Sequence, residues 1–457
     1  MAKNFRLNFS GASSNDHMKK IALVGFGREN ESAYRHFARQ GHDITIFDES
    51  LSPALPVPSG VKANLGKDKT SLLFEGGFDL VLRTPPINPS RLRGLPVWSA
   101  TREFFAQCPA PIIGVTGTKG KGTTASLIDS ILRAAGIKCH LVGNIGKPAL
   151  DILDNLKGDE IVVYELSSFQ LWDMEQSPQT AVVLMIEPDH LDVHPSFDDY
   201  LRAKGNITRW QKAGDVCVYL GKNSYSRQLA ELSSGDKLPF GQPPGAYTRE
   251  GYFWMNEQKI CSIQQIKLPG AHNLLNACAA ITAAWRFTND PRAIAKGLAL
   301  FEGLDHRLKL VGEVAGAAYY DDSIATTPGS AIAAIRAFKR PKILILGGSD
   351  KGAYFGGLIK EIARSRSVKA VIAVGTLGSS IARGLAGAGF KNVVNLGLDV
   401  SMPEVVNRAC ALAKKGDVVV LSPAAASFDM FKSYEDRGEQ FKAAVKRLQA
   451  AAPKRPV

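Results

Sequence analysis

One glycine-rich stretch constrains the fold of this chain more than any other. It runs from Gly114 to Thr124, follows the apolar residues 111–113 and precedes a helical pattern over residues 125–132. Glycines let backbone N–H groups curl around anionic oxygens, and the start of a helix adds a favourable partial positive charge. Lys121 in this loop is long enough to reach a terminal phosphate. The stretch therefore predicts a nucleotide-triphosphate loop between a buried strand and a helix.

The spacing of this loop departs from the commonest phosphate loop. That form has four residues between its first glycine and the Gly-Lys pair, and a serine or threonine directly after the lysine. Gly122 fills the last place here, so a hydroxyl ligand for a metal has to come from Thr123 or Thr124. An ordinary strand-to-helix turn with lysines for solubility is the alternative. By itself, the loop indicates only that a nucleotide binds.

Length and composition limit the class of protein. A chain of 457 residues is too long for one core and should form about three domains. The net charge of +13 is scattered, so we expect attraction for anionic small molecules rather than nucleic-acid binding. Six cysteines without a C-x-x-C pair argue against a zinc knuckle or a disulfide framework and fit a reducing compartment. No apolar run approaches the ~18 residues that span a bilayer, so we expect a cytoplasmic protein with no membrane partner.

The N-terminal part has the pattern of a nucleotide-binding half-fold. The buried-strand run 21–24 ends in a Gly-x-Gly turn that includes Gly27, and the next strand ends in Asp48. A further short strand ends just before Thr84. Ligands in open parallel sheets bind beyond the carboxyl ends of the strands, so we expect these three residues to face one pocket. A purely structural tight turn is the alternative.

Two later strands place acidic and imidazole groups near the loop. Glu165 ends the apolar strand 161–164, and His190 follows the apolar strand 181–186 between two aspartates. Magnesium prefers one or two carboxylates with waters and phosphate oxygens, and an imidazole is an occasional addition. The pattern predicts a Mg²⁺ site, with Glu165 the sharper candidate because an acid at the end of an apolar strand has no packing reason to be there. A helix-capping or surface carboxylate is the alternative. A histidine such as His190, taken alone, is more often structural.

The last third of the chain again alternates strands and helices. A helical segment with Asn273 and Asn276 on one face precedes a glycine-containing linker that ends in Arg307. Two asparagines three residues apart can bridge a base or ribose, although Asn273 also suits a helix cap. Several strand-like runs follow, the first of which ends in Asp322. Consecutive strand–helix units of this kind predict a doubly wound sheet.

Seven motifs occur in the order found in the Mur ligases, and the chain resembles that family from about residue 20 to its C-terminus. The motifs are Gly117-Thr118-Lys119-Gly120-Lys121, Glu165-Leu166-Ser167-Ser168-Phe169-Gln170-Leu171, Asp189-His190-Leu191-Asp192, His272-Asn273 with Asn276-Ala277, Gly303-Leu304 with His306-Arg307, Asp322-Ser323 with Ala325-Thr326, and Leu421-Ser422-Pro423-Ala424 with Ala426-Ser427. Each motif alone is a weak signal, whereas the ordered set is highly specific.

The resemblance implies an α/β fold of three domains behind a flexible leader at residues 1–18. A Rossmann-like domain that binds the UDP-sugar would span residues 19–105. A central P-loop ATPase domain with a parallel sheet and a small β region would span 106–304, and a Rossmann-like domain that binds the amino acid would span 305–457.

The implied activity is ATP-dependent ligation of D-glutamate to UDP-N-acetylmuramoyl-L-alanine in peptidoglycan precursor synthesis. In this reaction the substrate carboxylate takes the ATP γ-phosphate, and the incoming amine attacks the resulting acyl phosphate. The resemblance thus implies small-molecule substrates, ATP and two Mg²⁺ sites. We expect a monomer.

The resemblance also assigns residues to each part of the site. Catalytic roles fall to Lys121, Glu165, His190 and Lys204. ATP would be held by Gly117, Thr118, Lys119, Gly120, Lys121, Gly122, Thr123, Thr124, Asn276, Arg307 and Asp322. The metals would be held by Thr123, Glu165, His190 and Lys204, the last as a carbamate that bridges or orients the second ion, with an unmodified lysine as the alternative. The UDP-substrate would contact Gly27, Asp48, Thr84, Asn144, Ser167 and Gln170, and glutamate would contact Thr326, Lys351, Ser427 and Tyr434.

Three positions depart from the family pattern and keep alternatives open. Ile324 stands where a lysine is usual, so L-glutamate or another amino acid stays an alternative substrate. Tyr434 replaces a common phenylalanine, and Gly122 replaces a hydroxyl residue. The folylpolyglutamate synthases share the Gly-Lys-Gly loop, but they begin with the ATPase unit, whereas about a hundred residues precede it here.

Two other classes of function remain as alternatives to a ligase. A catalytically silent nucleotide-binding regulator on the same fold is one, although it would have little use for two metal positions. An NAD-dependent oxidoreductase is the other, suggested by the Gly-x-Gly turn. Asn30 occupies the place of the third glycine of that fingerprint and argues against it.

Overall fold

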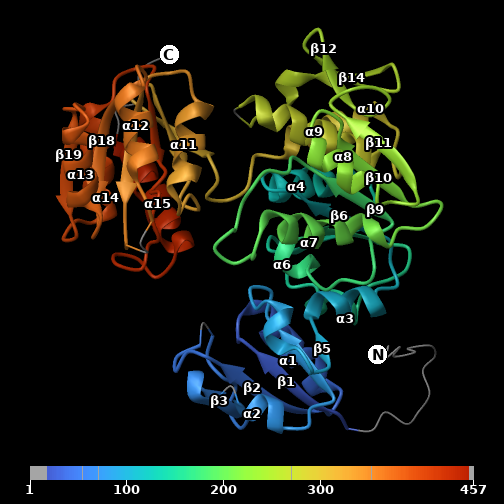
Figure 1. Cartoon of the computed structure of the whole chain (residues 1–457). Coiled ribbons are helices and arrows are strands. Elements are labelled where there is room, and N and C mark those ends of the chain that lie inside the picture. The colour runs from blue at the N-terminus through green and yellow to red at the C-terminus, as the bar shows by residue number, and fades with distance from the viewer. Residues whose placement is uncertain (1–17, 54, 70, 269, 351–352, 452–457) are drawn as a thin grey trace. The chain divides into compact units, whose positions relative to one another are not determined.

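The computed structural model describes residues 18–53, 55–69, 71–268, 270–350 and 353–451. Residues 1–17 of the predicted leader and the predicted glutamate ligand Lys351 lie outside the described residues. The chain divides into two compact units, the first made of Met1–Ile266 with Leu274–Phe301 and the second of Lys267–Asn273 with Glu302–Val457. Figure 1 labels many of the helices and strands of both units.

The first unit begins with a parallel sheet of strand order β3-β2-β1-β4-β5. Its strands are β1 (Lys20–Val24), β2 (Asp43–Asp48), β3 (Lys62–Leu65), β4 (Leu80–Arg83) and β5 (Val97–Trp98), and its helices are α1 (Arg28–Arg39), α2 (Ser71–Glu75) and α3 (Ala100–Gln107). Ile21 and Leu23 of β1 pack into one buried cluster, whereas Ala22 and Val24 pack into another on the opposite face. The continuous apolar run of this strand therefore reflects a sheet that is covered on both sides.

A second parallel sheet in this unit has the order β11-β10-β9-β6-β8-β7. Its strands are β6 (Ile112–Thr116), β7 (Cys139–Gly143), β8 (Ile161–Glu165), β9 (Thr180–Val183), β10 (Val216–Leu220) and β11 (Asp236–Phe240). The helices among them are α4 (Lys121–Ala134), α5 (Leu150–Leu153), α6 (Ser168–Leu171), α7 (Phe197–Arg209) and α8 (Ser224–Ala230). Since β6 lies between β8 and β9, the carboxyl ends of these three strands meet at one edge.

The small β region predicted for the central part is an antiparallel sheet. It consists of β12 (Tyr247–Arg249), β13 (Tyr252–Met255) and β14 (Gln258–Ser262), followed by the helices α9 (Ala271–Ala284) and α10 (Pro291–Leu300). Helix α10 packs on α4, where the Ser130 hydroxyl donates a 2.7 Å hydrogen bond to Gly297 O. The helix after the phosphate loop is thus supported on its far side.

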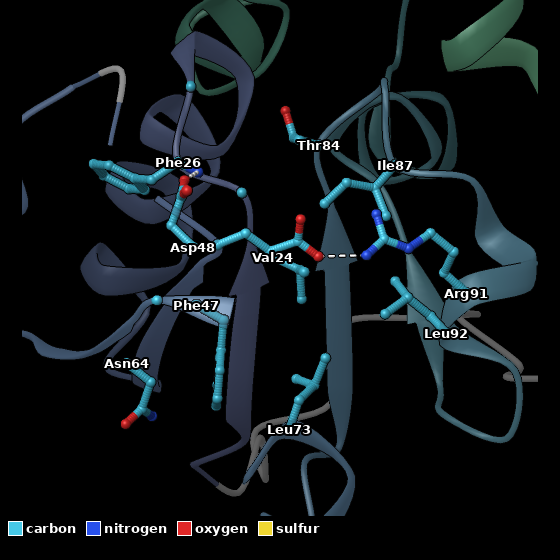
Figure 2. A pocket seen from close by; sticks show the side chains of 14 residues that line it. Val24, Phe26, Phe47, Asp48, Asn64, Leu73, Thr84, Ile87, Arg91 and Leu92 are labelled. Carbon is cyan, nitrogen blue, oxygen red and sulfur yellow. Dashed lines mark hydrogen bonds and ion pairs between the residues drawn. The ribbon is translucent and has the colours of Figure 1, made fainter. Parts of the chain in front are cut away.

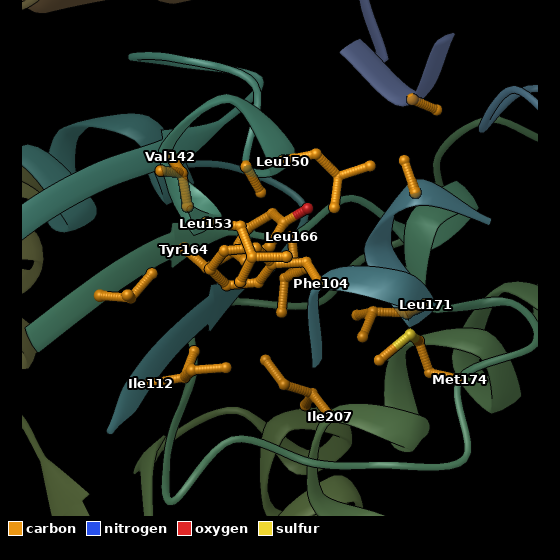
Figure 3. Packing of buried hydrophobic residues seen from close by; sticks show 14 of the residues in the cluster. Phe104, Ile112, Val142, Leu150, Leu153, Tyr164, Leu166, Leu171, Met174 and Ile207 are labelled. Carbon is orange, nitrogen blue, oxygen red and sulfur yellow. The ribbon is translucent and has the colours of Figure 1, made fainter. Parts of the chain in front are cut away.

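One buried cluster includes residues from both parallel sheets of the first unit. It contains Phe37 and Ile46 from the first sheet layer together with Val142, Tyr164 and Ile207 from the second. Figure 3 shows Phe104 of α3 packed beside Tyr164 and Leu153 within this cluster. Apolar residues of both parallel sheets are thus buried against one another.

The second unit holds a mixed sheet of order β15-β16-β20-β17-β18-β19, in which β15 is antiparallel to β16 and the other pairs are parallel. Its strands are β15 (Lys309–Val314), β16 (Ala317–Asp321), β17 (Lys342–Gly347), β18 (Val368–Val374), β19 (Val393–Gly397) and β20 (Val418–Leu421). Its helices are α11 (Pro328–Ala337), α12 (Gly356–Arg364), α13 (Gly378–Gly387), α14 (Met402–Leu412) and α15 (Tyr434–Ala451). Apolar clusters cover both faces of this sheet.

The predicted α/β class with doubly covered parallel sheets is confirmed. The predicted helix after the phosphate loop is longer than its apolar pattern, because it begins at Lys121 and ends at Ala134. The strand predicted over 181–186 is shorter and ends at Val183. No helix in the described ranges is long and apolar enough to cross a membrane.

Candidate active site

The glycine-rich loop lies at the carboxyl edge of the second sheet, between β6 and α4. The register places Val115 beside Glu165 and Thr116 beside Val183, so the residues after β8 and β9 emerge next to the loop. This is the edge at which ligands bind in open parallel sheets. The structure therefore brings the predicted loop, Glu165 and the segment that leads to His190 to one place.

Gly120 forms the turn into α4 in a conformation that suits glycine. Its φ is +88°, and a Cβ placed there would lie 2.4 Å from Asn276 Oδ1. The loop consequently packs tightly against α9, which brings Asn276, a predicted nucleotide contact, beside it. Room for a backbone without a side chain is what a phosphate cradle needs.

The side chains of the two lysines in the loop point in different directions. Lys121 Nζ donates 3.0 Å hydrogen bonds to the carbonyl oxygens of Gly117 and Thr118, so its ammonium lies over the loop. Lys119 is exposed and forms a 2.5 Å ion pair with Glu187. Lys121 is therefore the better placed of the two to meet a phosphate bound in the cradle.

Two threonine hydroxyls at the start of α4 could serve as metal ligands. The common phosphate loop has a serine or threonine directly after its lysine for this purpose, and Gly122 stands there in this chain. Thr123 and Thr124 are both buried. Within the part of the chain that the structure describes, Thr124 Oγ1 has no hydrogen-bond partner. A buried hydroxyl, a buried Glu165 carboxylate and loop amides form an oxygen-rich donor set that suits Mg²⁺ and a triphosphate.

No preformed metal cage accompanies this donor set. Over the described ranges, no three or more His, Cys, Asp or Glu side chains converge as metal ligands. Magnesium commonly takes only one or two protein carboxylates and completes its octahedron with phosphate oxygens and water. The residues present fit a metal that arrives with a nucleotide.

Lys204 of α7 is fully buried behind the loop. Its Nζ donates to Gly117 O at 2.9 Å and to Thr116 Oγ1 at 3.3 Å, and it lies 4.7 Å from the centre of the Tyr200 ring. Burial, and then the charge of Lys121, lower the pKa of Lys204 well below its usual range. An amine in this setting spends more of its time neutral than a surface lysine does.

His190 lies in the turn after β9 with a left-handed backbone of φ +54°. Its side chain is about half exposed, and its Nε2 lies 3.7 Å from Asp189 Oδ2. The ring contacts Phe169 edge-on, with 5.0 Å between ring centres. Phe169 belongs to α6, so His190 is held near the helix that follows Glu165.

His194 is a buried residue at this site that the sequence reasoning did not single out. Its Nδ1 lies 2.8 Å from Asp199 Oδ2 and its Nε2 lies 3.0 Å from Ser168 Oγ. Its ring stacks on Phe169. The Asp-His-x-Asp motif draws attention to His190, whereas only the packing of α6 against α7 reveals the role of His194 in joining them.

A cavity of about 360 Å³ opens at the carboxyl edge of the first sheet. Gly27, Asp48 and Thr84 all line it, so the structure brings these predicted UDP-substrate contacts together (Figure 2). Its apolar wall comes from Phe47, Leu73, Ile87 and Leu92, among others. Arg91 and Glu49 form an ion pair at its lining, drawn as a dashed line.

An asparagine side chain holds the Gly-x-Gly turn beside this cavity by hydrogen bonds, at the position where the dinucleotide-binding fingerprint has its third glycine. Asn30 is fully buried, and its Nδ2 donates to the carbonyl oxygens of Val24, Gly25 and Leu82. The position therefore has a structural function. Asp48 Oδ2 accepts a 2.8 Å hydrogen bond from Phe26 N and thereby shapes the same turn.

The residues predicted at the muramoyl end follow β7 and β8. Asn144 is exposed in the turn after β7. Ser167 and Gln170 form a capping box at α6, in which Ser167 Oγ accepts from Gln170 N and Gln170 Oε1 accepts from Ser167 N. This reciprocal cap fixes both side chains at the start of the helix.

The second unit gathers its own set of predicted residues. Asp322 is buried and accepts from Ser422 Oγ at 2.7 Å and from Leu308 N at 3.1 Å. Burial raises the pKa of Asp322 to about 7, against these two hydrogen bonds. The predicted nucleotide contact Arg307 is exposed.

A buried arginine that the sequence reasoning missed ties the predicted glutamate-binding loops together. Arg437 donates to Ser323 O at 2.8 Å and to Ala425 O at 3.2 Å, and Ser323 Oγ donates to Tyr434 O. Ser427 is buried nearby in sequence, two residues after Ala425, whereas Thr326 is exposed. Arg437 thus anchors the segments that carry Thr326, Ser427 and Tyr434.

Two family models match the chain. The Mur ligase middle domain matches residues 115–284, and the glutamate ligase domain of Mur ligases matches residues 306–425. Together they include all but the first residue of the phosphate loop, α6, α7 and every strand of the sheet of the second unit.

Relatives match over nearly the whole chain. The UDP-N-acetylmuramoylalanine–D-glutamate ligase of Acetivibrio thermocellus is 38% identical, over 94% of this chain and 97% of that protein. The protein of the same name from Clostridium novyi is 34% identical over the same shares.

Solved structures share the fold. The UDP-N-acetylmuramate–alanine ligase of Thermotoga maritima has a TM-score of 0.59 at 18% identity, and the comparison covers 95% of this chain and 100% of that one. The MurF ligase of Thermotoga maritima in complex with ADP has a TM-score of 0.56 at 18% identity, covering 95% and 96%. With relatives above 30% identity along its length, the chain belongs to the Mur ligase family.

Proposed function

We propose that this chain is an ATP-dependent ligase that joins D-glutamate to UDP-N-acetylmuramoyl-L-alanine. The observation that carries the proposal is the phosphate loop at the sheet edge, with Lys121 over it and Glu165 and Lys204 beside it. Relatives that match 94% of the chain bear the name of this activity. An amide-forming ligase needs such a nucleotide site next to a site for its acyl substrate.

The reaction that fits these residues has two steps. A carboxylate oxygen of the muramoyl-alanine substrate attacks the γ-phosphorus of ATP, and the bond to the β-phosphate oxygen breaks to release ADP. The glutamate amine then attacks the acyl carbon, loses a proton and expels inorganic phosphate. Lys121 and the loop amides would stabilise the negative charge of the transferring phosphoryl group.

Thr123 or Thr124 and Glu165 would hold one Mg²⁺, and His190 with a carbamylated Lys204 would hold or orient a second. Bound Mg²⁺ neutralises phosphate charge and polarises the group that is transferred. The burial of Lys204 and its lowered pKa support a reactive neutral amine. Asn276, Arg307 and Asp322 would contact the nucleotide.

The UDP-sugar would occupy the cavity lined by Gly27, Asp48 and Thr84. Asn144, Ser167 and Gln170 would contact its muramoyl end. Glutamate would be held in the second unit by Thr326, Lys351, Ser427 and Tyr434, because a dicarboxylate needs cationic and hydroxyl donors.

The domain ranges 19–105, 106–304 and 305–457 belong to this proposal, as do a monomeric state and a cytoplasmic location. The small-molecule substrates of the reaction call for no membrane or nucleic-acid partner. The two parallel sheets of the first unit and the mixed sheet of the second supply one sheet for each proposed domain.

Phosphate release tests the proposed function. The purified chain is incubated with ATP, Mg²⁺ and UDP-N-acetylmuramoyl-L-alanine, and D-glutamate, L-glutamate and other amino acids are supplied in turn. We expect turnover with D-glutamate only, and Lys121→Ala controls for contaminating ATPases. No turnover with any amino acid would overturn the ligase, and preference for L-glutamate would trace to the departure at Ile324.

A further inference from the structure

Helix α6 is held from outside its own domain by two charged residues of the first sheet layer. Ser167 is its N-cap, two residues after Glu165, and Gln170 lies in its single turn. Glu29 of α1 contacts the side chain of Gln170, and Arg83 at the end of β4 contacts the backbone of Phe169. Residues more than 80 positions away in sequence therefore set the position of this short helix.

The contact of Glu29 fixes which way the Gln170 amide faces. Gln170 Oε1 accepts from Ser167 N at 2.8 Å and from Ser167 Oγ at 2.9 Å. Its Nε2 donates to Glu29 Oε1 at 2.6 Å. Since the oxygen is committed to Ser167, the amide nitrogen must face α1, and a carboxyl oxygen is an acceptor of the right kind there.

Arg83 connects the same helix to the cavity of the first sheet. The guanidinium is buried, donates to both carboxylate oxygens of Asp173 and to Phe169 O, and also donates to Pro85 O and Ile87 O. Ile87 and Thr84, which follows Arg83 directly, line the cavity. The cavity wall and α6 thus share one rigid link.

We propose that Glu29 is a positioning residue for the muramoyl end of the substrate and acts through Gln170 and Ser167. Together with Arg83, it couples occupancy of the UDP cavity to the geometry of α6. This inference rests on the proposed function, because it uses the assignment of Ser167 and Gln170 to the muramoyl end. The resemblance to the Mur ligases assigns no role to Glu29, which is the second residue of α1.

The surroundings of Glu29 favour a carboxyl group that acts as a hydrogen-bond acceptor rather than only as a negative charge. Burial raises its pKa to about 7, although the Gln170 hydrogen bond and the Arg83 charge both lower it. A carboxyl oxygen accepts from Gln170 Nε2 whether or not the group carries a proton. The isosteric Glu29→Gln keeps an acceptor at this point, whereas Glu29→Ala removes it.

Steady-state kinetics of Glu29→Ala, Glu29→Gln, Gln170→Ala and the Glu29→Ala/Gln170→Ala double variant test the proposal. We expect Glu29→Ala to raise KM for UDP-N-acetylmuramoyl-L-alanine by about fivefold to tenfold, the effect of one lost hydrogen bond. KM for ATP and D-glutamate should stay unchanged, and Glu29→Gln should restore KM to within about twofold. The double variant should be no worse than Gln170→Ala, because Glu29 acts through that residue.

Glu31→Ala is the matched control. Glu31 lies on the same helix, and its ion pair with Arg35 is on the exposed face. We expect it to leave every KM unchanged. A merely structural effect of Glu29→Ala would lower the active fraction and hence kcat for all substrates alike, without raising one KM.

Several outcomes would overturn the inference. They are an unchanged KM for the UDP-substrate in Glu29→Ala, a Glu29→Gln variant as defective as Glu29→Ala, or additive effects of the two alanine substitutions. Absence of turnover in the unaltered chain would instead overturn the proposed function, so the two failures are distinguishable.

Discussion

At the scale of single residues, the site depends on charged groups that are buried beside neutral partners. Lys204 illustrates this, because among the described residues its ammonium donates to a carbonyl oxygen and a hydroxyl oxygen and not to a carboxylate. A buried ammonium without a hydrogen-bonded counter-ion is costly. Conversion of the amine to a carbamate would replace this buried cation with an anion that a bound Mg²⁺ could neutralise.

We predict that the activity depends on dissolved CO₂ through Lys204. Activity should fall in CO₂-depleted buffer and return when bicarbonate is added, as followed by phosphate release. Lys204→Arg, which cannot deprotonate, should lower kcat on the order of 100-fold, the effect of losing one electrostatic group at a phosphoryl-transfer site. An Arg variant that retains CO₂-sensitive activity would contradict this role.

A second residue-scale prediction concerns Asp322 and pH. Its pKa is about 7 in the folded chain, against 3.8 for an ordinary aspartate side chain, so the folded state keeps a proton that the unfolded state has lost. Its stabilising contribution is complete below about pH 4 and is lost as the pH rises through about 7. Asp322→Asn, which mimics the protonated acid, should therefore reduce the loss of unfolding free energy between pH 5 and 8 by on the order of 3 kcal/mol.

Denaturant unfolding of the nucleotide-free chain at several pH values measures this difference. The Asn side chain can donate to Ser422 Oγ and accept from Leu308 N, the two groups that Asp322 contacts. Parallel pH profiles for the variant and the unaltered chain would show that Asp322 titrates normally.

At the scale of elements, the phosphate loop is shaped by the helix behind it. Gly120 begins α4 and Gly136 follows its other end, both with positive φ, at +88° and +78°. A Cβ on Gly120 would collide with Asn276 Oδ1, whereas nothing lies within 4 Å of a Cβ on Gly136. An alanine at Gly136 would therefore add backbone strain alone, whereas an alanine at Gly120 would add backbone strain and a displacement of the loop.

We predict that Gly136→Ala lowers stability by about 1 kcal/mol, the cost of a left-handed alanine, and that Gly120→Ala lowers it by more because of the added clash with Asn276 Oδ1. Only Gly120→Ala should raise KM for ATP, by about tenfold. The clash would shift a backbone N–H group of the loop that is proposed to donate to a charged phosphate oxygen. Thermal unfolding and ATP kinetics of the two variants measure this. Equal ATP kinetics in both would show that the contact with Asn276 has no bearing on nucleotide binding.

At the scale of the whole molecule, the two parallel sheets of the first unit share an apolar cluster and are connected by a buried ion pair. Arg83 is 1% exposed, and its pair with Asp173 joins the end of β4 to the segment after α6. Arg39 and Asp154 make a similar connection on the surface, where both side chains are more than half exposed.

We predict that Arg83→Ala lowers the unfolding free energy by about 3–5 kcal/mol, because it leaves the Asp173 carboxylate without its partner. Arg39→Ala, the matched surface variant, should change it by less than about 1 kcal/mol. Denaturant unfolding followed by tryptophan fluorescence measures both. Similar small losses would mean that the shared apolar core alone joins the two sheets.

Much of the fold and part of the site could be predicted from local sequence. The Gly114–Thr124 loop, the apolar strands and Glu165 at a strand end follow from patterns within a few residues, because glycine φ preferences and strand burial act locally. Parallel order then brought Gly27, Asp48 and Thr84 to one cavity, as the rule for strand ends predicts. The family followed from the order of the motifs.

Only the tertiary structure decided which side chains meet across long stretches of chain. Gln170 meets Glu29 across 141 positions, Arg437 meets Ser323 across 114, and Lys204 reaches the carbonyl of Gly117 across 87. No periodicity encodes such pairs, since they depend on how helices pack on sheets. The sequence by itself therefore determined the kinds of element and the chemistry of the loop, and packing determined which buried groups hold that chemistry in place.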